Sequence, residues 1–274
     1  MSASAPIGVV DSHAHLEWPD FAADREAVLA RARAAGVVAI LAIGSAAGPE
    51  RLDAAIPFAE QHDWVFATVG IHPQQTLLAR PEHLDRLHEL ARHPRVIGFG
   101  EIGLDYYRDY APRDAQQRLF RELLGVARSA RLPVIIHCRA AWADTLEILG
   151  QEWRTSGLGG ILHCFSGTLE DARRGMEMGF LISFAGNITY RKADALRELA
   201  RALPLEALLV ETDAPFLPPE GFRGQRNEPA RVVEVARAVA SVRNLGLAEF
   251  AAATTANFER LFRLRPSSLT GSRG

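Results

Sequence analysis

Histidine and acidic residues follow apolar segments at five places in the chain. These places are Asp11-Ser12-His13-Ala14-His15, Gly100-Glu101-Ile102-Gly103, His137-Cys138-Arg139, Ile161-Leu162-His163-Cys164-Phe165 and Glu211-Thr212-Asp213-Ala214-Pro215. Buried His, Glu and Asp side chains cost free energy unless they are paired or coordinated. Imidazole and carboxylate groups are also common ligands of divalent metal ions. The pattern therefore predicts a metal-dependent hydrolase.

The first segment contains two histidines, His13 and His15, separated by one position. In an extended strand both side chains point to the same face, about 6.6 Å apart along the chain, so both can bind one ion. A lone His-x-His pair is more often a core or surface feature than a metal site. Its combination with the other segments favours a metal centre with six predicted ligands: His13, His15, Glu101, His137, His163 and Asp213.

Six ligands exceed the needs of one catalytic zinc ion, which normally uses three protein ligands and a water molecule. We therefore expect two divalent ions, which the ligand set allows to be zinc, manganese or magnesium. The only lysine, Lys192, is not placed to form a carbamylated bridge, so Glu101 is the expected bridge. One ion is expected on His13, His15, Glu101 and Asp213, and the other on Glu101, His137 and His163.

The catalytic roles are assigned to two of the predicted ligands, Asp213 and Glu101. Two cations favour the ionised form of a water molecule between them, and Asp213 is placed to orient that water and accept its proton. Glu101 is expected to hold both ions. Glu211 lies two positions before Asp213 and points to the same face of its strand, where we expect it to support a ligating histidine.

The elements that must position these residues alternate along the chain. Eight short apolar runs, near-continuous in hydrophobicity, are typical of parallel strands covered on both faces. They alternate with stretches of helical periodicity, which predicts an α/β fold, specifically a (β/α)8 TIM barrel with its active site at the carboxyl ends of the strands. The expected strands are Gly8–Asp11, Val37–Ile43, Val65–Ile71, Val96–Gly100, Val134–Ile136, Gly160–Leu162, Phe180–Phe184 and Leu208–Val210.

The length of 274 residues suits one large domain over residues 1–264. The Ser- and Gly-rich tail, residues 265–274, is expected to be frayed. The expected helices are Ala22–Ala35, Pro81–Ala91, Gln116–Ala130, Trp142–Glu152, Glu170–Met178, Lys192–Ala202, Glu228–Val242 and Leu247–Phe262.

Composition excludes several classes of protein. The formal net charge is -2, so nucleic-acid binding would require a local basic patch. Two cysteines, Cys138 and Cys164, argue against a disulfide scaffold and favour a reducing compartment. Each follows a histidine, so strand alternation would turn its thiol toward the outer helices. The sequence shows no leader and no apolar run of about 18 residues, which predicts a cytoplasmic protein without membrane contact or an obligate protein partner.

Several longer strings resemble the TatD family. They are Asp11-Ser12-His13-Ala14-His15-Leu16, Gly70-Ile71-His72-Pro73, Gly100-Glu101-Ile102-Gly103-Leu104-Asp105-Tyr106, His163-Cys164-Phe165-Ser166-Gly167, Glu211-Thr212-Asp213-Ala214-Pro215 and Arg226-Asn227-Glu228-Pro229. The resemblance implies a metal-dependent deoxyribonuclease of the amidohydrolase superfamily, often a 3′-5′ exonuclease, with the same six ligands. Gln225 and Ala140 depart from the family pattern, in which lysine and an acidic residue are common at these positions.

Residues expected in the loops after the strands favour an anionic substrate. Arginine side chains suit bidentate phosphate contacts, and loop aromatics could stack on bases of a single strand. Single-stranded DNA is therefore the expected partner. The predicted substrate contacts are His72, Arg139, Arg223 and Arg226.

Two other functions fit the same residues. Related barrels cleave esters or amides, so a D-aminoacyl-tRNA deacylase is an alternative that uses the same activated water. A non-enzymatic metal-holding protein is the third hypothesis. A missing ligand or base would favour that hypothesis, and the sequence has all of the expected ones.

Outside the predicted centre, His62, His83, His88 and His93 fall in or beside expected helices and are predicted to be solvated.

Overall fold

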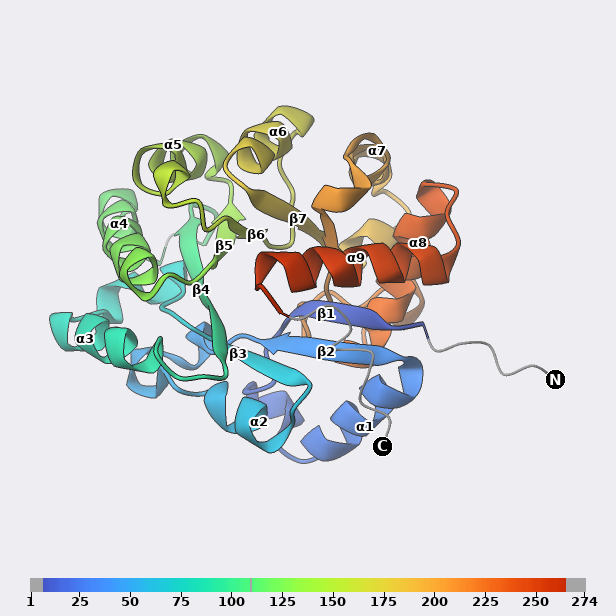
Figure 1. Ribbon diagram of the computed structural model, residues 1–274, viewed down its shortest axis with the longest axis horizontal. Coiled ribbons are helices and arrows are strands. Elements are labelled where there is room, and N and C mark those ends of the chain that lie inside the picture. Colours follow the sequence, from blue (N-terminus) through green and yellow to red (C-terminus); the bar gives the residue numbers. More distant parts are fainter. Residues whose placement is uncertain (1–6, 109, 265–274) are drawn as a thin grey trace.

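A computed structural model describes residues 7–108 and 110–264, and Figure 1 shows their arrangement. Within these residues eight parallel strands form a sheet in the order β1 to β8, and a bridge between Ala14 and Ala214 brings its two edges together. The predicted (β/α)8 TIM barrel is confirmed. The strands are β1 Val9–Ala14, β2 Val37–Ala42, β3 Val65–Val69, β4 Val96–Asp105, β5 Val134–Arg139, β6 Gly160–Leu162, β7 Phe180–Phe184 and β8 Leu208–Val210.

Helices surround this barrel (Figure 1), and α1 to α8 each follow a strand, while α9 follows α8. The short helix α2 was not predicted, because its six residues span less than two turns of periodicity. The predicted tail, residues 265–274, lies outside the described residues. The helices are α1 Arg25–Ala35, α2 Ile56–Gln61, α3 Pro81–Leu90, α4 Arg113–Ala130, α5 Trp142–Glu152, α6 Leu169–Glu177, α7 Asp194–Ala202, α8 Val232–Val242 and α9 Leu247–Leu261.

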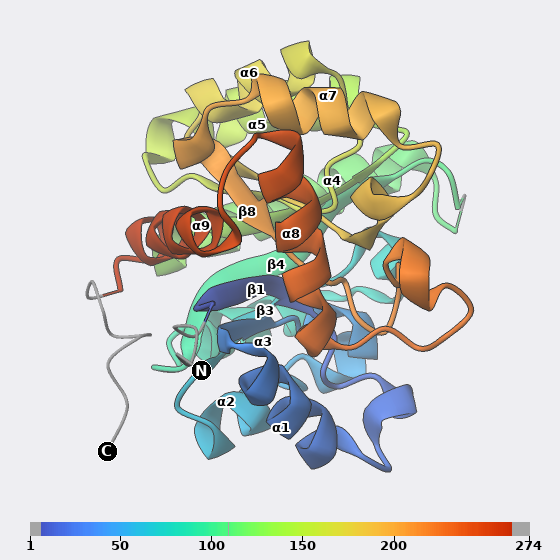
Figure 2. The same ribbon diagram turned by 90° about the vertical axis from the view of Figure 1, so that its right-hand side faces the viewer.

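Helix α9 lies across the amino-terminal end of the barrel (Figures 1 and 2). Thr255 donates to the carbonyl of Gly8 before β1, and Asn257 donates to the carbonyl of Leu208 at the start of β8. Phe258 and Phe262 join the apolar side chains that fill the barrel interior. This end is therefore packed, which leaves the carboxyl ends of the strands as the open face.

Strand β4 differs most from the sequence-based expectation. It was expected to end at Gly100, but it continues to Asp105, with an irregular register against β5 between Gly100 and Ile102. A Cβ atom at Gly103 would lie 2.1 Å from the carbonyl oxygen of His137, so glycine is needed where these strands approach. Glu101 consequently lies within a strand and not at its end. The two glycines looked like strand terminators but allow close packing.

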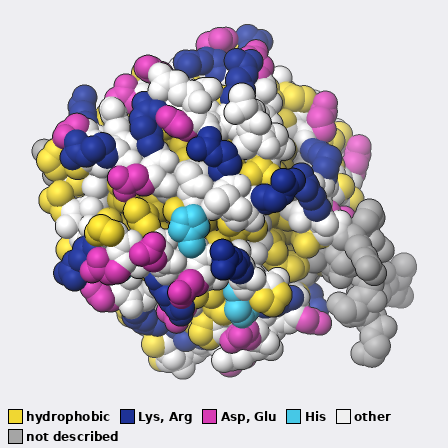
Figure 3. All heavy atoms as spheres, turned by 60° about the vertical axis from the view of Figure 1, so that its left-hand side comes forward, with side chains coloured by type: hydrophobic (Ala, Val, Ile, Leu, Met, Phe, Trp, Pro, Cys, Tyr) yellow, Lys and Arg dark blue, Asp and Glu magenta, His cyan; other side chains and the backbone are white. Residues whose placement is uncertain are grey.

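Charged side chains of both signs are interspersed over the face that Figure 3 displays. This distribution agrees with the small net charge of -2. Helix α8 begins later than expected, at Val232, because Pro229–Arg231 form a separate 3-10 turn before it. Among the described residues, no helix combines the length and apolar character that crossing a membrane requires.

Candidate metal centre

The carboxyl ends of the strands surround a cavity of about 810 Å³. Five of the six predicted ligands line its wall, and they are His15, Glu101, His137, His163 and Asp213. They come from β4, from β5 and from the segments that directly follow β1, β6 and β8, which lie far apart in the sequence. The other wall residues are Trp18, Ala46, His72, Gln74, Gln75, Arg108, Tyr110, Cys138, Arg139, Cys164, Ser166, Asn187, Phe216 and Leu217.

Three side chains form a compact group at the β1 and β8 side of the cavity. The Nε2 atoms of His13 and His15 are 3.3 Å apart. Asp213 Oδ1 lies 3.6 Å from His13 Nε2 and 3.4 Å from His15 Nε2. Ligands about 2.05 Å from a tetrahedral zinc ion would be separated by about 3.3 Å. These spacings therefore fit three ligands of one cation.

Glu101 lies between this group and a second one. Its Oε2 atom is 3.6 Å from His13 Nε2 and 3.8 Å from His15 Nε2. Its Oε1 atom faces the other way, at 2.6 Å from His137 Nδ1 and 3.1 Å from His163 Nε2. The two carboxylate oxygens thus face separate histidine pairs. This is the disposition expected of a bridging ligand.

The His72 imidazole lies close to the predicted metal ligands. Its Nε2 atom lies 3.5 Å from Glu101 Oε1, while its Nδ1 atom accepts a hydrogen bond from the backbone of Gln74. His72, Glu101 and His137 offer ligand atoms that all lie within 4.8 Å of one another. The side chain also lines the cavity, so its position allows either metal coordination or contact with a substrate.

Carboxylates hold the outer nitrogen atoms of three of these imidazoles. His163 Nδ1 donates to Glu211 Oε1 at 2.9 Å, which agrees with the predicted supporting position of Glu211. His15 Nδ1 and Glu17 Oε1 are 3.3 Å apart, and His137 Nε2 and Asp105 Oδ2 are also 3.3 Å apart. Such outer partners fix the orientation of a ligating imidazole.

Sequence reasoning missed two of these partners, Glu17 and Asp105. Glu17 lies two positions after His15, so the alternation used for His13 could have identified it. Asp105 was not among the predicted site residues, and its Oδ1 atom accepts hydrogen bonds from the backbone of Tyr107 and Arg108. The other oxygen of Asp105 reaches His137 because β4 is longer than predicted.

The electrostatic environment of the cluster favours the ionised forms of Glu101 and Asp213. Burial alone would raise the pKa of Glu101, but the surrounding imidazoles hold it well below its ordinary value. Burial likewise opposes ionisation of Asp213, yet its hydrogen bond with His15 and the other imidazoles lower its pKa. Burial alone would lower the pKa of His15, but its hydrogen bonds with Asp213 and Glu17 raise it to about 10. A bound cation would replace the imidazole protons.

The cysteines behave differently from each other. Both are free thiols. The Cys138 residue touches the cavity wall, but its Sγ atom accepts a hydrogen bond from Thr145 of α5, which agrees with the predicted outward orientation of this thiol. The prediction for Cys164 is wrong, because this residue lies on the cavity wall. β6 ends at Leu162, and the backbone of Cys164 has a positive φ of 43°, so strand alternation no longer applies there.

The predicted arginine contacts separate into two groups. Arg139 lines the cavity, with its guanidinium 3.9 Å from the centre of the Tyr107 ring. Arg226 does not line the cavity, because it makes two hydrogen bonds of 2.8 Å to the Asp24 carboxylate. Arg223 is exposed and lies over Tyr190, also outside the cavity wall. Of the three arginines predicted to contact substrate, the cavity wall therefore includes Arg139 but not Arg223 or Arg226.

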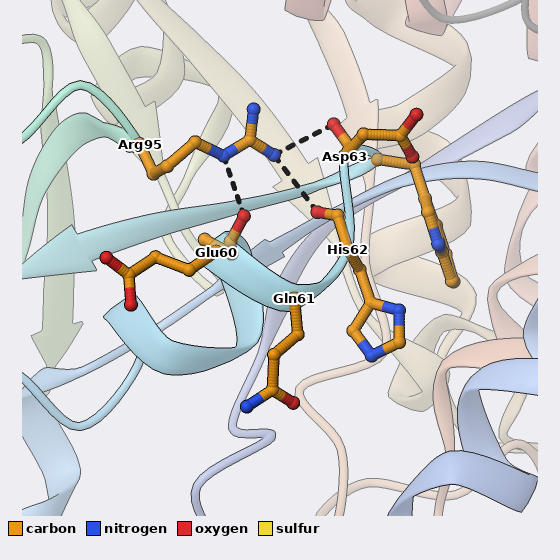
Figure 4. Close-up of a pocket in the computed structure, with 7 residues that line it drawn as sticks. Glu60, Gln61, His62, Asp63 and Arg95 are labelled. Carbon is orange, nitrogen blue, oxygen red and sulfur yellow. Dashed lines mark hydrogen bonds between the residues drawn. The ribbon is translucent and has the colours of Figure 1, made fainter.

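The remaining histidines lie away from the cavity. His62 pairs with Glu26 and His93 with Glu60 near the surface. His83 is buried, contrary to prediction, because its Nδ1 atom accepts from the Arg80 backbone at the start of α3. Figure 4 shows a smaller hollow, of about 400 Å³, where Arg95 donates to backbone carbonyls around the end of α2.

Known proteins are similar to this chain in sequence and fold. YabD of Bacillus subtilis, named an uncharacterized metal-dependent hydrolase, is 39% identical over 254 residues, covering 93% of this chain and 98% of the relative. A protein of Cronobacter sakazakii named 3′-5′ ssDNA/RNA exonuclease TatD is 36% identical over 244 residues, covering 87% of this chain and 92% of the relative.

A solved structure is also similar to this chain. The crystal structure of YjjV, a TatD homologue from Escherichia coli, has a TM-score of 0.89 and 33% identity, and the match covers 94% of this chain and 99% of the other. The family model described as TatD related DNase matches residues 10–263. The resemblance seen in the sequence is confirmed, and the chain belongs to the TatD family of metal-dependent hydrolases.

Proposed function

We propose that this hydrolase cleaves phosphodiester bonds of single-stranded or end-frayed DNA, releasing nucleotides from the 3′ end. The observation that carries the proposal is the position of Glu101 between two histidine pairs at an open cavity. Arg108 and Arg139 on the same wall suit an anionic substrate. The name of the Cronobacter relative, a 3′-5′ ssDNA/RNA exonuclease, supports this choice of bond and polarity.

The residues fit two divalent cations. We assign His13, His15, Glu101 and Asp213 to one cation, and Glu101, His137 and His163 to the other. The spacing of His13, His15 and Asp213 matches the edges of a tetrahedral site, and the Nδ1 atom of His13 is turned away from the group. When bound, the cations would lower the pKa of a water molecule and offset negative charge on the phosphate.

The side chains have separate tasks in this proposal. Asp213 is ionised and keeps 14% of its side chain exposed, so it can orient a water molecule and accept its proton. Glu211 and Glu17 hold His163 and His15 in place. Arg139 binds the substrate phosphate as a bidentate donor. We also propose a cytoplasmic location, where both thiols would remain reduced.

The test is a substrate panel with metal-reconstituted protein. Labelled single-stranded oligonucleotides, a D-aminoacyl-tRNA and small esters would be compared. We expect mononucleotides to be released from the oligonucleotides, and His13→Ala to abolish the release. His62→Ala is the matched control, because His62 lies outside the cluster and pairs with Glu26. Rapid deacylation without any cleavage of oligonucleotides would overturn the proposal in favour of the aminoacyl ester.

A further inference from the structure

The two opposite sides of the cavity opening have unlike chemistry. Trp18 follows β1 and Phe216 follows β8, and these strands are neighbours across the closure of the barrel. Arg108 follows β4 and Arg139 is the last residue of β5, and these two strands pair with each other. In a ring of eight strands, these two neighbouring pairs lie on opposite sides. One side thus carries the pair of Trp18 and Phe216, and the other carries the two arginines together with Tyr110, with the histidine cluster between them.

Trp18 and Phe216 form an aromatic pair beside the cluster. Their ring centres are 5.0 Å apart with an edge-to-face angle of 75°, and each ring lies within 6.2 Å of the His15 ring. Trp18 is half-buried, while Phe216 keeps 41% of its surface exposed. An exposed aromatic face at the edge of a cavity is suited to stacking on a nucleobase.

The Phe216 ring is not needed to hold its own loop. The backbone nitrogen of Phe216 donates to Asp213 at 2.8 Å, and its carbonyl accepts from Asn227 at 2.7 Å. Asn227 is fully buried and also donates to the carbonyl of Thr212. Because backbone contacts already fix the loop, an anchoring role does not account for the exposed ring.

The opposite side suits a continuing phosphate chain. Arg108 and Arg139 are both exposed, and among the described residues they supply the guanidinium groups of the cavity wall. The arginine near the aromatic side, Arg226, is already paired with Asp24. A strand with several phosphates therefore finds free positive charge only on the β4 and β5 side of this wall.

We propose that Trp18 and Phe216 stack on the base of the terminal nucleotide, while Arg108 and Arg139 hold the phosphate chain that continues from it. This inference rests on the proposed function, because it assigns the two ends of the same substrate. The cavity then accepts a strand in one direction. Stacking tolerates any base, so the platform selects for the presence of a base and not for a sequence.

The first test removes the base. Two single-stranded oligonucleotides would differ only at the 3′-terminal nucleotide, which carries adenine or an abasic tetrahydrofuran. We expect Trp18→Ala and Phe216→Ala to raise KM for the adenine substrate roughly tenfold, with kcat little changed. KM for the abasic substrate should stay close to that of the unsubstituted protein. Equal losses on both substrates, or no loss on either, would overturn the proposal.

Control variants separate stacking from loop damage. Trp18→Phe keeps an aromatic face and should retain most of the base dependence. Phe222→Ala changes a ring in the same loop as Phe216, but this ring lies 4.2 Å from the Arg231 guanidinium and outside the cavity wall. It should leave KM unchanged. Moving the abasic site to the 5′ end should restore the full effect of Trp18→Ala, and failure to do so would contradict the proposed direction.

A binding measurement distinguishes this inference from the proposed function. Deoxyadenosine monophosphate should quench tryptophan fluorescence of the metal-loaded protein, while deoxyribose 5-phosphate should not. Trp18→Phe should remove the quenching. If the protein cleaves no oligonucleotide but shows this quenching, the proposed function fails and the base platform stands. If cleavage occurs without any dependence on Trp18 and the base, the platform fails and the nuclease assignment stands.

Discussion

The two ends of the barrel use the same residue types in different ways. At the carboxyl end, histidines and carboxylates are buried together around Glu101 and face an open cavity. At the other end, His93 and Glu60 pair near the surface, and Arg95 donates to backbone carbonyls, including that of Val65. Residue type alone therefore does not identify a site. The burial of several titratable groups around one cavity is the feature that marks a candidate functional site.

The largest expected effect tests the reactive end of the barrel. Glu101→Gln removes the charge that faces both histidine pairs. We expect kcat/KM for oligonucleotide cleavage to fall by more than about 10²-fold, beyond the loss typical of an outer partner. Glu60→Gln, at the other end, should retain full activity. Comparable activity of Glu101→Gln and Glu60→Gln would contradict the assignment of the reaction to the carboxyl end of the barrel.

A smaller loss is expected from an outer partner of the cluster. Glu211→Gln keeps the size of the side chain but removes the charge that orients His163. Metal affinity, measured by competition with a chelator, should fall about 10- to 100-fold. The effect of Glu147→Gln, an acid on the exposed surface of α5 that accepts from Gln151, should be negligible. An unchanged affinity for Glu211→Gln would show that His163 does not need this support.

At the amino-terminal end the expected effect is on stability. Arg95→Met removes hydrogen bonds to the carbonyls of Ala59, His62, Asp63 and Val65. The free energy of unfolding in urea should fall by about 1–3 kcal/mol, with kcat/KM unchanged. Arg118→Met, which removes an exposed pair with Asp114, should change stability by less than about 0.5 kcal/mol. Lost activity with unchanged stability would place Arg95 in the functional machinery.

The sequence predicted that these side chains gather at one end of the barrel, because simple periodicities determine their positions. Strand alternation places His13 and His15 on one face, and parallel strands bring residues such as His163 and Asp213 to the same end. The failures have local causes. Glycines extended β4 beyond Gly100, and a positive φ turned Cys164 into the cavity.

Side-chain pairing in loops was beyond the same reasoning. Arg226 was predicted to contact substrate because its loop follows β8. Its guanidinium instead binds Asp24, which precedes α1 about 200 residues earlier in the chain, a pairing that no periodicity reveals. In the comparison of the two ends, Arg226 resembles Arg95: it is a structural arginine, although it lies at the reactive end.

The smallest expected effect tests this assignment of Arg226. Its hydrogen bonds, with a contribution from Arg31, lower the pKa of Asp24 to about 2. A depressed carboxylate pKa gives stability that is present above about pH 4 and is lost as the pH falls through about 2. The difference in Tm between the unsubstituted protein and Asp24→Asn should therefore narrow from pH 7 to pH 3. A constant difference would show that the pairing contributes nothing to folding.

Anomalous diffraction from crystals of the manganese- or zinc-loaded protein tests the central claim most directly. We expect two peaks, one on each side of the Glu101 carboxylate, with His13, His15 and Asp213 around one and His137 and His163 around the other. Ions bound elsewhere, or a cluster whose side chains coordinate no ion at saturating metal, would contradict the account.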